Sequence, residues 1–478
     1  MNDSSLKSRV MHSLKWVALG KIATQAIRWI TTFWVIRMLL PEDYALVAMS
    51  DVVSGFLTLF TGAMFTASII KDRELTTAKL QQVFGLIILF HAFLFVLQIV
   101  TAVPMGLYYD EPKVTNILYV NSVILLINIF AIIPGSLLNK DMEFKKESMI
   151  TATSNIVASI STLIMAYNDF GFWAIIIGEI INYSIRTVFL LFIKPVFLLP
   201  QFRFQEIGSH IRFGGMLSVH VALFYILLHL DVFIAGRVLS LTEVGFYAVA
   251  TQIALMPQRK LLPLLKQVAF PAFSTIQDDK KSVSFYILKS QRICFSLTIP
   301  IFWGLASVVD TVIPVILGDK WNNAILPAII ILSIMPLRFS DELFNPALKS
   351  QDAVSHMIVN VLIATCLLVG GLILMIDRGA VGLSLAWALS FPIAYLFILA
   401  RNCKKVGVSI GELLVNFLKS AGCGVIMSGA VYATKMVLTE QSVLNLLIYI
   451  GVGAVAYTLT AAVINRAGLA ELRALIRR

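Results

Sequence analysis

Long apolar stretches dominate this chain of 478 residues, and they restrict it to folds that lie in a lipid bilayer. Hydrophobic residues make up 58% of the sequence and charged residues only 14%, whereas soluble domains carry about 25% charged residues. A helix crosses the hydrocarbon core of a membrane with about 20 apolar residues. The sequence therefore predicts an all-α integral membrane protein and excludes a soluble globular enzyme.

Division of these stretches at turn and charge signals gives fourteen predicted transmembrane spans. They cover residues 13–39, 42–69, 80–104, 114–138, 147–167, 170–193, 208–238, 243–272, 284–309, 323–346, 353–375, 379–401, 410–434 and 442–465. Several spans exceed the minimum length, as expected of tilted helices that extend beyond the bilayer.

Basic residues gather in every second loop between these spans. The loop with Lys140, Lys145 and Lys146, for example, follows the cation-poor loop 108–112. Cytoplasmic loops of membrane proteins carry such an excess of lysine and arginine. The alternation places both termini in the cytoplasm, and it explains the net charge of +11 without a nucleic-acid partner. The four cysteines are scattered singly, which predicts neither a metal site nor a disulfide framework.

The sequence also repeats itself weakly at offsets of about 200 residues. Residues 37–48, which close span 1 and open span 2, resemble residues 237–250, and residues 169–174 resemble residues 377–382. Two six-helix halves with the same orientation would be related by an axis along the membrane normal, with a substrate site between them. The predicted domains are an N-terminal lobe (1–204), a C-terminal lobe (205–405) and two extra spans with a tail (406–478).

Four cations interrupt the apolar spans. Lys21 and Arg28 lie in span 1, and Arg259 and Lys260 lie in span 8, with Arg259 about 22 Å along a helix from the start of its span. Charged groups at membrane depth face a bundle interior or a water-filled cavity. These four side chains therefore predict a positively charged lumen. The alternatives are salt bridges between helices and snorkelling of the side chains to the membrane surface.

Two acidic residues are candidates for binding a coupling ion or for gating. Asp51 begins a polar stripe in span 2, which continues at Ser54, Thr58 and Thr61 with helical spacing. The stripe is expected to line the cavity or to pack against span 1. Asp231 lies near the predicted periplasmic end of span 7. A fixed structural ion pair is the alternative for Asp51, and a structural role is favoured for Asp231.

An ordered set of short motifs gives the chain a family resemblance. The motifs are Lys15-Trp16 with Gly20, Leu40-Pro41-Glu42, residues 65–76, Phe144-Lys145-Lys146, Phe213-Gly214-Gly215, residues 245–248, residues 270–279 and Gly318-Asp319-Lys320-Trp321. In them the chain resembles the polysaccharide exporters of the multidrug/oligosaccharidyl-lipid/polysaccharide (MOP) superfamily, and most of all the Wzx-type flippases. It departs from the family at Ala45, where a glycine is usual.

The resemblance implies a two-lobed helical bundle in the bacterial inner membrane that works by alternating access. Such proteins carry an undecaprenyl-diphosphate-linked oligosaccharide from the cytoplasmic to the periplasmic leaflet, for lipopolysaccharide O-antigen, colanic acid or capsule-type polysaccharides. H⁺ or Na⁺ would be the coupling ion, and a polysaccharide polymerase would be a partner. The four cations would then bind the diphosphate, because arginine and lysine make charge-assisted hydrogen bonds to phosphate.

Catalysis by this chain is not expected. The sequence contains no Walker A, GxSxG or HExxH motif, so we expect a transporter without a cofactor or catalytic metal. Two other functions stay open. A cation-coupled multidrug antiporter belongs to the same superfamily, although a positive lumen suits its cationic substrates poorly. A membrane glycan polymerase or ligase would need a sizeable periplasmic loop, and every predicted periplasmic loop is short.

Overall fold

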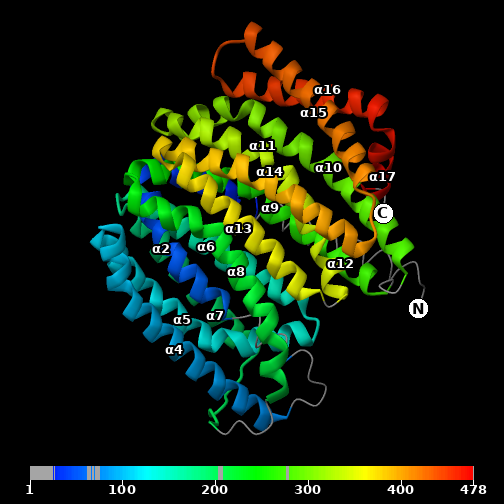
Figure 1. The fold of residues 1–478 in the computed structure, drawn as a ribbon. Coiled ribbons are helices and arrows are strands. Elements are labelled where there is room, and N and C mark those ends of the chain that lie inside the picture. The colour runs from blue at the N-terminus through cyan, green and yellow to red at the C-terminus, as the bar shows by residue number, and fades with distance from the viewer. Residues whose placement is uncertain are drawn as a thin grey trace, which may run out of the picture. The chain divides into compact units, whose positions relative to one another are not determined.

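The protein is all-helical in a computed structural model that describes residues 25, 27–61, 66, 69, 76–202, 208–275, 279–351 and 353–476 (Figure 1). The chain forms two compact units, Met1–Ala222 and Leu223–Arg478. Ten helical stretches of the described part are long and apolar enough to cross a membrane. The prediction of an all-helical, multi-pass membrane protein is confirmed.

Eleven of the fourteen predicted spans lie in these ten stretches, because Val354–Val406 contains two of them. The spans predicted at 13–39 and 42–69 extend into parts of the chain outside the described residues. The span predicted at 243–272 forms a continuous helix, but it carries Glu243, Arg259 and Lys260. These charges lower its hydropathy, so its place in the membrane depends on neighbours that accommodate them.

The first unit packs its helices around α5. Its elements are a helical segment at 27–38, α2 (Pro41–Leu59), α4 (Thr77–Tyr109), α5 (Pro112–Lys140), α6 (Phe144–Tyr167) and α7 (Trp173–Ile193). Leu57 of α2, Leu94 of α4 and Leu125 of α5 share one buried cluster. Prolines start α2 and α5, where a missing backbone N–H costs no hydrogen bond. Asp110 ends α4 in a left-handed conformation, with φ 57°.

The second unit is built around α11, which packs against α9, α10 and α14. Its elements are α8 (Gly208–Val238, which begins in the first unit), α9 (Leu241–Thr275), α10 (Lys280–Val312), a π-helical turn at Ile313–Leu317, a 3₁₀ segment at Asp319–Ala324, α11 (Ile325–Glu342), α12 (Asn345–Ser350), α13 (Val354–Met375), a 3₁₀ turn at Ile376–Arg378, α14 (Gly379–Val406), α15 (Ile410–Val437), α16 (Val443–Ile464) and α17 (Arg466–Ile476). Phe302, Phe339 and Trp321 are fully buried in this unit.

The last two spans, α15 and α16, form a hairpin beside α10 (Figure 1). Phe295 and Ile299 of α10, Met427 of α15 and Tyr457 of α16 belong to one buried cluster. A side chain at Gly424 of α15 would overlap Ile299, so the glycine permits the close approach of the two helices.

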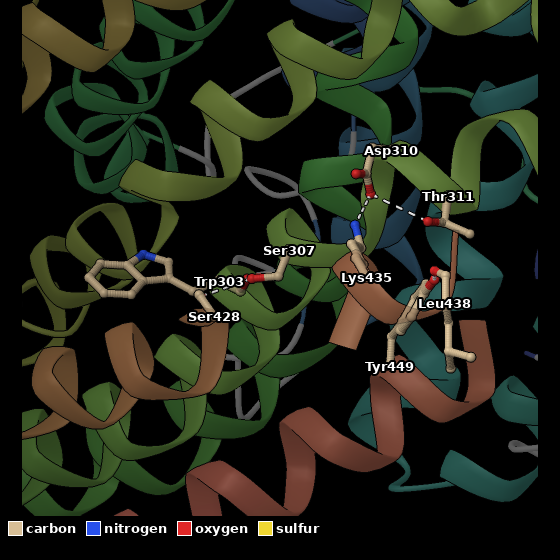
Figure 2. A network of polar contacts seen from close by, with 8 residues as sticks. All are labelled: Trp303, Ser307, Asp310, Thr311, Ser428, Lys435, Leu438 and Tyr449. Atoms are coloured by element: carbon tan, nitrogen blue, oxygen red, sulfur yellow. Dashed lines mark hydrogen bonds and ion pairs between the residues drawn. The ribbon is translucent and has the colours of Figure 1, made fainter. Parts of the chain in front are cut away.

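Polar contacts reinforce the α10–α15 interface. Figure 2 shows Ser307 of α10 beside Ser428 of α15, with a hydrogen bond of 2.8 Å, and Lys435 of α15 in an ion pair with Asp310 of α10. Satisfied polar contacts of this kind fix the packing of membrane helices. The two extra C-terminal spans are therefore fastened to α10 of the second unit.

A matching carboxylate contact appears in each unit and corresponds to the sequence repeat. Asp43, at the start of α2, accepts a hydrogen bond of 3.0 Å from the backbone N–H of Phe172, at the start of α7. Glu243, at the start of α9, accepts one of 2.6 Å from the N–H of Ala380, at the start of α14. The four residues occupy equivalent places in the two repeated motifs. Each carboxylate therefore caps a helix that lies more than a hundred residues further along the chain.

Glycines make room for both caps. Gly171 and Gly379 have left-handed φ angles of 56° and 64°. A Cβ atom on Gly171 would lie 3.0 Å from the Asp43 carboxylate, and one on Gly379 would overlap the carboxylate of Glu243. The repeated glycine in residues 169–174 and 377–382 thus has a structural explanation.

Loss of a cap is expected to lower stability. Asp43→Ala and Glu243→Ala should each reduce the free energy of unfolding by about 1 kcal/mol, the usual value of a helix N-cap. Thermal denaturation of the detergent-solubilised protein would measure the effect. Glu111→Ala is the matched control, because Glu111 precedes α5 without a side-chain capping bond. Equal melting temperatures for all three variants would contradict the capping role.

Candidate functional site

The predicted cations of the described chain are exposed side chains on long helices. Arg28 is exposed in the first unit, on the helical segment 27–38. Arg259 and Lys260 are exposed in the second unit, about half-way along the 35 residues of α9. Lys21 lies outside the described residues. That these cations line one lumen stays a prediction.

The polar stripe of α2 divides into an exposed and a buried part. The Asp51 side chain is exposed, whereas Ser54 is 7% and Thr61 5% exposed. The Ser54 hydroxyl accepts a hydrogen bond of 3.1 Å from the Gln98 amide of α4, and the same amide donates to the carbonyl of Leu118 in α5. Ser54 and Gln98 thus join α2 to α4 and α5, and Asp51 is the exposed carboxylate of the stripe.

Asp231 is the centre of a buried cluster in the second unit. The residue, on α8, is 3% exposed. One carboxylate oxygen accepts hydrogen bonds from the hydroxyl of Tyr247 on α9 and from the indole N–H of Trp387 on α14, the latter at 2.6 Å. The other oxygen accepts the backbone N–H of Val232 at 2.7 Å. Both oxygens of this carboxylate are therefore hydrogen-bonded, as a buried charge requires.

Arg338 of α11 completes the cluster, and the sequence analysis missed it. Its guanidinium carbon lies 4.5 Å from the centre of the Trp387 ring, a cation–π contact. It supplies positive charge near Asp231, so the cluster joins α8, α9, α11 and α14. Arg338 stands close to Asp341 and Glu342, which makes it resemble a span-end residue in sequence. Its position well inside the span predicted at 323–346 was the sequence signal that could have identified Arg338 as a candidate.

The second unit contains another buried polar group, between α10, α11 and α14. The amide of Gln291 donates to the carbonyl of Ser340 at 2.8 Å, and the Ser340 hydroxyl donates back to Gln291 at 2.6 Å. The same hydroxyl lies 2.6 Å from that of Tyr395. Such fully satisfied groups fix helix positions and leave no hydrogen-bonding capacity for a ligand. They are structural parts of this unit.

The candidate cations are all exposed in the described residues, whereas of the two candidate acids one is exposed and one is buried. Exposed guanidinium and ammonium groups on membrane helices can bind an anion that passes through the protein. Of the two candidate acidic residues, Asp51 is exposed, whereas Asp231 is buried among its hydrogen-bond donors. An ion-coupling role for either stays a prediction.

Comparison with known proteins identifies the family. The polysaccharide biosynthesis protein family matches residues 35–326. The lipopolysaccharide biosynthesis protein WzxC of Escherichia coli (strain K12) is 24% identical over 346 residues, which are 70% of this chain and 68% of WzxC. The teichuronic acid biosynthesis protein TuaB of Bacillus subtilis (strain 168) is 22% identical over 467 residues, or 95% of both chains. Succinoglycan transport protein ExoT of Rhizobium meliloti is 23% identical, with 64% of ExoT covered.

Solved structures identify the fold. The lipid II flippase MurJ, in an inward closed conformation, superposes with a TM-score of 0.74 at 16% identity, over 94% of this chain and 99% of MurJ. A MATE family multidrug transporter of the MOP superfamily, facing inward, gives a TM-score of 0.61 at 12% identity, over 80% and 95% of the two chains. Its fold thus resembles those of MurJ and of the MATE transporter, and by its sequence the chain belongs to the polysaccharide biosynthesis protein family.

Proposed function

We propose that this protein flips an undecaprenyl-diphosphate-linked oligosaccharide from the cytoplasmic to the periplasmic leaflet of the bacterial inner membrane. The two halves would alternate access to a lumen between them, with both termini in the cytoplasm. Family membership supports the class of substrate, because WzxC and TuaB are named for the biosynthesis of surface polysaccharides. The likeness to MurJ and MATE transporters supports a transport fold.

The exposed cations of the helical segment 27–38 and of α9 carry this proposal. A diphosphate is strongly hydrated, and its transfer into hydrocarbon is unfavourable unless protein donors replace its water. Arg28 in one half and Arg259 with Lys260 in the other would supply charge-assisted hydrogen bonds to the phosphate oxygens. The same positive charge would repel a cationic drug, which disfavours the antiporter alternative.

Asp51 is proposed to respond to the travelling anion. A carboxylate exposed on the same unit as Arg28 can pair with the cation when no phosphate is present and release it when phosphate arrives. The free carboxylate can then take up H⁺ or Na⁺. Transport that is independent of both ion gradients would remove this part of the proposal and leave the flippase itself intact.

Leaflet-resolved translocation in proteoliposomes tests the function. A fluorescent undecaprenyl-diphosphate oligosaccharide is placed in the inner leaflet, and its arrival outside is followed with a membrane-impermeant quencher. Protein-dependent arrival is expected, with glycan length unchanged. A lengthened glycan would indicate a polymerase instead. No translocation, together with gradient-driven movement of a lipophilic cation, would favour the antiporter and overturn the proposal.

A further inference from the structure

The segment that follows α7 is held against the rest of the first unit. Residues 194–202, here called the strap, follow α7 and form neither helix nor strand. At one end, the ammonium group of Lys194 pairs with the carboxylate of Asp141 at 2.6 Å. At the other end, Gln201 donates its backbone N–H to the Gln81 carbonyl of α4 at 3.0 Å and its side-chain amide to the Gln81 amide oxygen at 2.9 Å. Both ends of the strap are therefore fixed to the first unit.

The strap lies directly on α4. A Cβ atom on Gly85 would overlap the carbonyl oxygen of Gln201, so only glycine allows this approach. Val196 and Leu198 pack against the buried cluster that includes Val83 and Ile87 of α4. Two apolar side chains and the two hydrogen bonds of Gln201 thus hold the strap against the helix.

The opposite face of the strap is apolar and exposed. Exposure alternates along the strap: Val196 and Leu198 are half-buried, whereas Phe197 is 98% exposed and Leu199 79% exposed. Phe192, in the last turn of α7, is 80% exposed and continues the same type of surface. The strap is thus held against α4 on one side and exposes large apolar side chains on the other.

The membrane is the partner that this surface fits. The strap continues directly from the lipid-exposed end of a membrane helix, on the side that the basic loops assign to the cytoplasm. It cannot lie deep in hydrocarbon, because a backbone outside helices and strands would leave polar groups unpaired there. The boundary between head groups and acyl chains satisfies both requirements, since water reaches the backbone and the rings reach the chains. Pro195 and Pro200 lack backbone N–H donors and so reduce the need for water further.

We propose that the strap is an interfacial membrane anchor that inserts Phe197 and Leu199 into the cytoplasmic leaflet. The inference does not depend on which molecule the protein transports. It means that the chain after α7 stays against α4 at the membrane surface as far as residue 202.

Site-specific labelling tests the anchor. An environment-sensitive fluorophore is attached to Phe197→Cys in a protein whose four native cysteines are replaced and whose melting temperature is retained, reconstituted in phosphatidylethanolamine–phosphatidylglycerol vesicles. Met142→Cys is the matched water-exposed control, since Met142 is 76% exposed in the turn between α5 and α6. Phe93→Cys, 61% exposed within α4, is the lipid-facing control.

We expect iodide to quench the label at 197 about threefold less than the label at 142, because a shallowly inserted group lies below the head groups. A nitroxide near the lipid head group should quench it more than one at the chain end, with the reverse order at 93. Iodide quenching equal to that at 142 would put the strap in water and overturn the proposal. Shielding from iodide and from both nitroxides would show a protein cover and overturn it equally. Gln201→Ala should raise iodide quenching at 197, because it removes a fixing contact.

Discussion

Arg28→Gln and Arg259→Gln are each expected to slow translocation of the lipid-linked oligosaccharide by about tenfold to a hundredfold, with the protein still folded. A hydrogen bond to a charged group is worth about 1.5–3 kcal/mol, and each 1.4 kcal/mol corresponds to about a factor of ten. Glutamine keeps a polar hydrogen-bonding side chain, but it is shorter and lacks the charge that holds a diphosphate. The proteoliposome assay described above measures the initial rate for each variant.

Two further variants separate an anion-binding role from a structural one. Arg28→Lys keeps the charge and should retain part of the rate. Lys146→Gln is the matched control, because Lys146 pairs with Glu143 on an exposed surface and should transport normally. Unchanged rates in the arginine variants would exclude these side chains from the transport path. A fall in melting temperature that parallels the loss of rate would instead assign them to salt bridges.

Asp231→Ala should destabilise the second unit by about 3 kcal/mol. Removal of the carboxylate leaves the buried hydroxyl of Tyr247 and the N–H of Trp387 without their acceptor and takes the negative charge away from Arg338. Breaking a buried charged group costs this much because the remaining partners stay desolvated. The melting temperature of the purified protein and its yield after membrane extraction would both fall.

Further variants distinguish a structural role of Asp231 from a role in ion coupling. Asp51→Ala is the control, because that carboxylate is exposed and its loss should leave stability nearly unchanged. Trp387→Phe keeps the ring under Arg338 but removes one donor, and should cost less than Asp231→Ala. An Asp231→Asn protein with a normal melting temperature but with transport that has lost its dependence on H⁺ or Na⁺ would favour the coupling role instead.

Much of the fold followed from the sequence because its determinants are local. Apolar run length marks a membrane helix, and most of the predicted spans lie in the membrane-length helices of the described residues. The repeat at residues 37–48 and 237–250 was visible as a short motif, and the structure explains it by the caps at Asp43 and Glu243. The sequence shows that a carboxylate recurs in the two motifs. It does not show which backbone N–H the carboxylate caps, because that group lies more than a hundred residues further along the chain.

The interior of the second unit could not be predicted in this way. Tyr247, Trp387 and Arg338 come from three different helices, and nothing near any of them in sequence points to Asp231. The strap was also missed, because residues 194–202 have neither helical spacing nor a membrane-length apolar run. The alternation of buried and exposed side chains along it arises only because α4, with Gly85 and Gln81, lies beneath it.

The two caps have a consequence for how the protein is made. In each half the acceptor is synthesised first: Asp43 precedes its amide by 129 residues, and Glu243 precedes its own by 137. Since the ribosome delivers the chain from its amino end, α2 and α9 are already present when α7 and α14 emerge. The N-terminal end of α7, and likewise that of α14, therefore meets a carboxylate that has already been synthesised. This carboxylate positions the helix while the bundle is being assembled.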